Sequence, residues 1–141
     1  MISVILLAVD GSGHASRAVD LGIDVAAKYG ARLLVLTVRP HGPLSGVLAD
    51  FAAEEDLSAA EVHQRIVDDL VEQAGTHGVR DVEGLVEEGD ATTAILRAAE
   101  HHDADLIVMG SRGMSDLKGL MVGSVSHKVT HLANRPCLIV H

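Results

Sequence analysis

The chain has 141 residues, a length that fits one domain with one buried core, and we expect residues 1–141 to form a single domain. Its formal net charge is -9, and Tyr29 and Phe51 are its only tyrosine and phenylalanine, with no tryptophan. An acidic molecule repels nucleic-acid backbones and anionic lipid, and single-strand binders need aromatic rings for stacking. The composition therefore argues against nucleic-acid and membrane partners.

No apolar run of this sequence approaches the roughly 18 residues that a membrane-spanning helix needs. The opening run Ile2 to Val9 has no basic segment before it and no small-residue cleavage site after it, which is typical of a strand rather than a targeting signal. We therefore expect a cytoplasmic protein. The single cysteine, Cys137, lies in an apolar run, which predicts a buried and inert thiol.

Apolar segments of strand length alternate with helical patterns along the chain. The strands are expected at Ile2 to Val9, Leu33 to Val38, Val82 to Val86, Leu106 to Met109 and Cys137 to Val140. Most of these segments are continuously apolar, which is typical of parallel strands that are covered on both faces. The order predicts an α/β fold, with a doubly wound, open, five-stranded parallel sheet and helices on both faces.

The sequence also marks where several helices begin and end. Gly30 is expected to end the first helix, Asp90 to cap the third, and the last helix to stop before Pro136. The acidic cluster Glu54 to Asp56 predicts the start of the second helix, where negative charge favours the helix dipole. The stretch Pro40 to Asp50 contains glycine and proline and predicts a long irregular connection that can act as a flap.

Glycines cluster where an open α/β sheet binds its ligands, which is beyond the carboxyl ends of the strands at the point where the winding reverses. The first strand is followed by Asp10, and the fourth runs into Gly110 and Gly113. These glycines allow tight turns that expose backbone N–H groups. Gly123 and Ser124 then open the last helix, whose unpaired N–H groups suit a phosphate.

Polar side chains near the glycines add further donors. Ser124 and Ser126 supply hydroxyl groups, and Arg112, Lys118 and Lys128 are the nearest positive charges in the sequence. Because the net charge of the chain is negative, an anion needs this kind of local compensation. We therefore count Arg112 and Ser126 among the candidate nucleotide-binding residues.

Other phosphate-binding classes do not fit the spacing. The chain has neither a GxxxxGK[ST] P-loop nor a GxGxxG after its first strand, which excludes a Walker-type ATPase and a common dinucleotide fold. The third strand leads into Glu87 to Gly89 and the fifth ends at His141, where a phosphoacceptor receiver domain would carry an aspartate and a lysine.

The same segments resemble the universal stress protein family over essentially the whole chain, from Val9-Asp10-Gly11-Ser12 through Leu106 to Gly113 and on from Gly123 to Val140. ATP-binding members carry GxxG, nine further residues and then glycine followed by serine or threonine, and Gly110, Gly113, Gly123 and Ser124 match that motif. The resemblance implies a Rossmann-like, adenine nucleotide alpha hydrolase-like fold. It also implies an ATP-binding stress-response or signalling module rather than a fast enzyme.

The resemblance implies a role for each matching position. Asp10 is expected to contact the ribose or a phosphate-bound metal ion such as magnesium, Val38 to hold adenine through its backbone, and Met109 to line the base pocket. Family members commonly form homodimers through the last strand, here Cys137 to Val140. The residues expected around the phosphates are Gly110, Gly113, Gly123, Ser124 and Val125.

Several alternatives remain open at this point. The site can bind AMP or cyclic AMP, it can hydrolyse ATP slowly or transfer adenylate in a complex with an unknown protein partner, or it can be empty in a purely structural dimer. No residue pair looks like a nucleophile with its base. His127 and His131 are four residues apart but lack an HExxH pattern, so we expect both on the surface, opposite an inward face that includes Leu132.

Overall fold

The computed structural model describes residues 1–11, 15–112 and 123–141. Its strands confirm the predicted fold class, because all of them are parallel and form one five-stranded sheet in the order β3-β2-β1-β4-β5. The elements are β1 (Val4–Val9), α1 (Ser16–Tyr29), β2 (Arg32–Arg39), α2 (Gly46–Glu55), α3 (Ala59–Thr76), β3 (Val82–Glu88), α4 (Ala91–His101), β4 (Leu106–Gly110), α5 (Ser124–Leu132) and β5 (Cys137–Val140).

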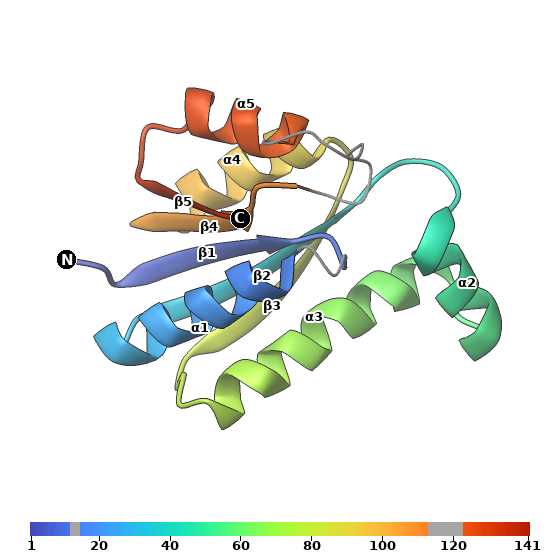
Figure 1. Cartoon of the computed structure of the whole chain (residues 1–141), viewed down its shortest axis with the longest axis horizontal. Coiled ribbons are helices and arrows are strands. Elements are labelled where there is room, and N and C mark those ends of the chain that lie inside the picture. The colour runs from blue at the N-terminus through green and yellow to red at the C-terminus, as the bar shows by residue number, and fades with distance from the viewer. Residues whose placement is uncertain (12–14, 113–122) are drawn as a thin grey trace.

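Helices cover both faces of the sheet, and this explains why its strands are continuously apolar (Figure 1). In β1, Ile5 and Leu7 pack into the core beneath α1 and α3, whereas Leu6 packs into the core beneath α4 and α5. All three side chains are fully buried. Successive residues of a strand point to opposite faces, so a strand between two helical layers has no polar face to present.

The predicted ends of two helices are confirmed. Gly30 ends α1 in the left-handed conformation, with φ of 62°, which glycine adopts at little cost. The carboxylate of Asp90 caps α4 by accepting hydrogen bonds from the backbone N–H and the hydroxyl of Thr93, at 2.9 and 2.8 Å. Within the described ranges, none of the helices has the length and apolar character needed to cross a membrane.

Two expectations for the middle of the chain were wrong. The segment predicted to be an irregular connection holds helix α2 from Gly46 onward, and Glu54 and Glu55 lie at its C-terminal end rather than at the start of a helix. The next helix begins instead after Ser58, whose hydroxyl and backbone N–H pair with Glu61 in a capping box. The inward position expected for Leu132 is also wrong, because that side chain is 63% exposed.

Asp105 ties the beginning of β1 to the beginning of β4. Its carboxylate accepts hydrogen bonds from the backbone N–H groups of Ser3 and Val4, at 2.8 and 2.9 Å. These two bonds favour the charged form and lower the pKa of Asp105 below its ordinary value. A carboxyl group whose pKa is lower in the folded chain stabilises the fold above its ordinary pKa, and this contribution is lost as the pH falls through the folded value.

We therefore expect Asp105→Asn to flatten the acid side of the stability profile. The free energy of unfolding, measured with urea, should fall less for the variant than for the parent between neutral pH and the range below about 3.9, the ordinary pKa of an aspartate. Asp69→Asn, at an exposed position of α3, is the matched control. An Asp105→Asn profile with the full acid loss of the parent would contradict this role of the carboxylate.

Candidate functional site

A cavity of about 750 Å³ opens at the carboxyl ends of the central strands. The chain leaves β1 toward α1 on one face of the sheet, whereas it leaves β4 toward α5 on the other face (Figure 1). Because β1 and β4 are hydrogen-bonded neighbours and the helices that follow them lie on opposite faces, the winding of the sheet reverses between these two strands. This is the position at which open α/β sheets bind their ligands, and the volume lies within the usual range for small-molecule sites.

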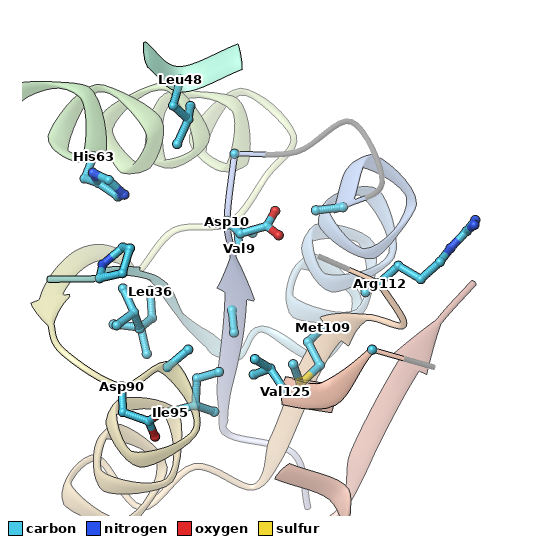
Figure 2. Close-up of a pocket in the computed structure, with 18 of the residues that line it drawn as sticks. Val9, Asp10, Leu36, Leu48, His63, Asp90, Ile95, Met109, Arg112 and Val125 are labelled. Atoms are coloured by element: carbon cyan, nitrogen blue, oxygen red, sulfur yellow. The ribbon is translucent and has the colours of Figure 1, made fainter. Parts of the chain in front are cut away.

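The cavity gathers the described residues that the sequence singled out. Gly113 and Lys118 lie outside the described residues, and Lys128 is exposed on α5 and does not line the cavity. Arg112 contributes to the wall, but Figure 2 shows its guanidinium group directed away from Asp10. The predicted residues that line the cavity are Asp10, Val38, Met109, Gly110, Arg112, Gly123, Ser124, Val125 and Ser126.

Helix α5 presents an uncapped N-terminus to the cavity. Gly123 is its N-cap residue, and the described part of the chain provides no side-chain cap for its first turn. Helix α4 also begins at the cavity wall, but there the carboxylate of Asp90 already accepts from the first turn. The N–H groups and positive dipole end of an uncapped helix favour an anion, so α5 is the better anion site of the two.

The hydroxyl of Ser126 is engaged inside the protein. Ser126 is 2% exposed, and its Oγ donates to the carbonyl oxygens of Ser111 and Gly123, at 3.0 and 3.1 Å. The backbone N–H of Gly123 donates to the carbonyl of Ser111 as well. Together these bonds hold the start of α5 against the end of β4. In this conformation the Ser126 hydroxyl is not a free donor toward a ligand, and the expectation of such a donor is corrected.

Two carboxylates line the cavity, one after β1 and one before α4. Asp10 is half-buried at the end of β1, and Figure 2 shows its carboxylate in the middle of the site. The second carboxylate, Asp90, accepts hydrogen bonds from Thr93, chiefly from the backbone N–H, and these bonds lower the pKa of Asp90. Asp90 is therefore charged at neutral pH. These charges repel an anion, so an anionic ligand depends on the N–H groups of α5 and on added cations.

The backbone at Gly11, directly after Asp10, lies close to α3. Gly11 has φ of 81°, and a Cβ at this position would lie 2.8 Å from Cδ1 of Ile66 in α3. Glycine removes both the conformational cost and the collision. Gly11 therefore allows α3 to approach the end of β1 and close the cavity on that side.

The sequence did not identify the wall formed by the middle of the chain. Pro40, Leu44 and Leu48 line the cavity from the β2–α2 connection and α2, and His63 lines it from α3. The glycines and prolines between residues 40 and 46 indicated a connection that can act as a flap, but they did not indicate which residues would line the cavity. His63 belongs to no motif, and only the packing of α3 brings it there.

Metal-binding clusters are absent from the described parts of the chain, where no three histidine, cysteine or acidic side chains converge. His127 and His131 are both exposed on α5, as predicted, with their rings stacked 6.0 Å apart. Of the charged side chains described at the cavity, Asp10 and Asp90 have the oxygen atoms that Mg²⁺ prefers. A magnesium ion here would need further ligands, such as phosphate oxygens.

The fold and the cavity define an open, doubly wound α/β domain with a ligand-sized site at its winding reversal. The model of the universal stress protein family matches residues 1–141, and the chain belongs to this family. It is 39% identical over 140 residues to a universal stress protein of Thermus aquaticus, covering 99% of each chain. It is 34% identical over 148 residues to the universal stress protein YxiE of Bacillus subtilis, again covering 99% of each.

Solved structures of the family share the fold. The universal stress protein UspA of Lactobacillus plantarum superimposes with a TM-score of 0.84 at 23% identity, covering 99% of this chain and 98% of that one. A universal stress protein in complex with cAMP has a TM-score of 0.76 at 26% identity, covering 99% and 97%.

Proposed function

We propose that this universal stress protein is a cytoplasmic signalling module that binds ATP, or a closely related adenine nucleotide, in the cavity at the carboxyl ends of β1 and β4. One observation carries the proposal: the uncapped N-terminus of α5 and the wall residues Asp10, Val38 and Met109 face a single cavity of about 750 Å³. A phosphate at α5 and a base near β2 make use of both parts of that cavity.

The roles follow from these positions. The backbone N–H groups of Ser124 and Val125 bind the phosphates, and Gly123, Gly110 and Gly113 of the matching motif surround them. The apolar side chains of Val38 and Met109 enclose the base, and the backbone of Val38 pairs with its polar edge. Asp10 binds the ribose or a magnesium ion that the phosphates also hold, because Mg²⁺ is commonly bound by one carboxylate plus phosphate oxygens.

AMP or cyclic AMP is the second candidate ligand. The structurally similar protein with 26% identity is in complex with cAMP, which supports a nucleotide with few phosphates. The charges of the described wall support the same choice, since Asp10 and Asp90 are negative and the guanidinium of Arg112 is directed away. Without magnesium, a triphosphate therefore meets more repulsion than a monophosphate. Slow ATP hydrolysis remains an alternative activity, to be tested by turnover with and without magnesium.

Adenine nucleotides should raise the melting temperature of the protein. A ligand that binds only the folded chain adds RT ln(1 + [L]/Kd), about 2.7 kcal/mol at a hundredfold excess over Kd. For a domain of this size that corresponds to a shift of roughly 8 °C. Thermal shift measurements with ATP and magnesium, AMP and cyclic AMP, each against GTP, should give the largest shift with an adenine nucleotide.

Gly123→Val should abolish the shift, because its side chain fills space at the N-terminus of α5 where we place a phosphate. Gly75→Ala is the control, since a Cβ at Gly75 has no heavy atom within 4 Å and the residue lies away from the cavity. Equal shifts with ATP and GTP would remove the adenine assignment. No shift with any nucleotide at millimolar concentration would overturn the proposed function and favour a structural dimer.

We further propose that two copies pair through β5. This strand lies at one edge of the sheet, bonded only to β4 among the described strands, so its outer backbone groups are available to a partner strand. Its side chains Cys137 to Val140 are all partly exposed. The predicted burial of Cys137 is only partial in the single chain, and this partial burial raises the pKa of its thiol, which suits a packing role better than a reactive one.

Sedimentation velocity should find a dimer at micromolar concentration. Leu138→Lys and Ile139→Lys should give monomers, because each places a charge in the paired strand. Both side chains also pack against the two cores, so circular dichroism must show that the variants remain folded. A parent that is monomeric throughout the micromolar range would contradict pairing through β5.

A further inference from the structure

His63 is a buried histidine in the wall of the cavity. It lies on α3, its side chain is only 3% exposed, and it lines the same cavity as Asp10 and Val38. In Figure 2 its ring extends from α3 toward the cavity. A buried polar ring is costly unless its nitrogen atoms find partners, so both nitrogens need to be accounted for.

One hydrogen bond fixes which nitrogen carries the proton. Nδ1 of His63 lies 2.9 Å from the carbonyl oxygen of Ala59, one turn earlier in α3. A carbonyl only accepts, so Nδ1 donates, and the neutral ring then has its lone pair on Nε2. Among the described residues no hydrogen bond reaches Nε2 and no acidic side chain forms an ion pair with the ring. Nε2 therefore presents a hydrogen-bond acceptor to the cavity in a fixed orientation.

The position of His63 matches the base rather than the phosphates of a bound nucleotide. Figure 2 shows His63 and Leu36 on the side of the cavity away from Arg112 and Val125. Leu36 is an apolar wall residue of β2, whereas Val125 belongs to the first turn of α5. A ligand with its phosphates at α5 must extend its other end toward β2 and α3.

In a nucleotide, the adenine base has one hydrogen-bond donor group, the exocyclic amine at the six-position. This amine has two N–H bonds. One N–H can meet a backbone acceptor at Val38, which leaves the other for a second acceptor. Guanine and hypoxanthine carry a carbonyl oxygen at the same position, whose lone pairs would face the lone pair of Nε2. An acceptor at this end of the cavity therefore distinguishes the two kinds of purine.

We propose that Nε2 of His63 accepts a hydrogen bond from the exocyclic amine of adenine and thereby selects adenine over 6-oxo purines. The inference rests on the proposed nucleotide site and adds the residue that determines its base specificity. His63 acts through direct contact with the ligand, and the bond from Nδ1 to Ala59 holds the ring in the orientation required.

His77, which follows the last residue of α3, offers a matched control. Nδ1 of His77 lies 2.8 Å from the carbonyl oxygen of Gln73, also four residues earlier, but His77 is exposed and does not line the cavity. His77→Phe therefore removes the same type of local bond as His63→Phe without removing an acceptor from the site. Any effect that only His63→Phe produces belongs to the cavity.

The test is a calorimetric comparison of three ligands: AMP, inosine monophosphate with its 6-oxo group, and purine riboside monophosphate, which has only hydrogen at the six-position. The parent should bind AMP at least tenfold more tightly than either analogue, because both leave Nε2 unpaired. In His63→Phe this preference should fall by about tenfold, mainly through weaker AMP binding. His77→Phe should keep the preference of the parent.

His63→Gln provides a second variant in case the phenylalanine variant fails to fold. The side-chain carbonyl of glutamine reaches about as far as Nε2 and can accept the same hydrogen bond, so part of the preference should return. An unchanged preference for AMP in both variants would overturn the role of His63 while leaving the nucleotide site in place. A parent that binds none of the three ligands would instead overturn the proposed function, and the role of His63 with it. A fourth ligand, 2′-deoxy-AMP, tests contact with the ribose instead. If the parent binds it much more weakly than AMP, but binds purine riboside monophosphate as tightly as AMP, the acceptor contacts the ribose and the inference is contradicted.

Discussion

The parallel pairing of β1 with β4 is the constraint on which the rest of the site depends. Each of these strands is followed by a connection to a helix, and the helices lie on opposite faces of the sheet. Right-handed crossovers leave no other arrangement for strands wound outward in both directions. The resulting space is bordered by Asp10 and Gly110 at the strand ends and by the start of α5, so the topology of the main chain determines where the cavity lies.

The electrostatics of the site follow from this geometry. A chain with a net charge of -9 is a poor partner for an anion at long range, and the carboxylates of Asp10 and Asp90 extend that disadvantage into the cavity. Helix α4 uses Asp90 to satisfy its own first turn, whereas α5 begins at Gly123 without a side-chain cap. At the cavity, the N-terminus of α4 is therefore already capped by a carboxylate, whereas the described part of the chain provides no such cap for α5.

The sequence predicted those parts of the site whose residues are close together along the chain. Gly110, Gly123 and Ser124 belong to one spaced motif between a strand and a helix, and the chemistry of glycine and of helix N-termini is local. The parallel sheet with helices on both faces was predictable for a similar reason, because continuous apolar runs indicate strands that are buried on both faces. The structure confirmed the fold class.

The wall formed by α2 and α3 was not predictable in the same way. Glu54 and Glu55 suit a helix start by charge but end α2, and the capping box of Ser58 and Glu61 was the more specific signal for where α3 begins. No local pattern distinguishes His63 in the cavity from His77 on the surface, since both donate to a carbonyl one turn earlier. Their difference arises from tertiary packing alone.

The central claim, that an adenine nucleotide binds at the carboxyl ends of β1 and β4, is tested most directly by amide chemical shifts. In a titration of the ¹⁵N-labelled protein with AMP or with ATP and magnesium, the largest changes should fall on the amides of Asp10, Val38 and Gly123 to Val125. A smaller cavity of about 260 Å³ between α4 and α5, lined by Leu96 and Arg135 among others, provides the internal comparison. Changes centred on that smaller cavity, or no changes at millimolar nucleotide, would contradict the account.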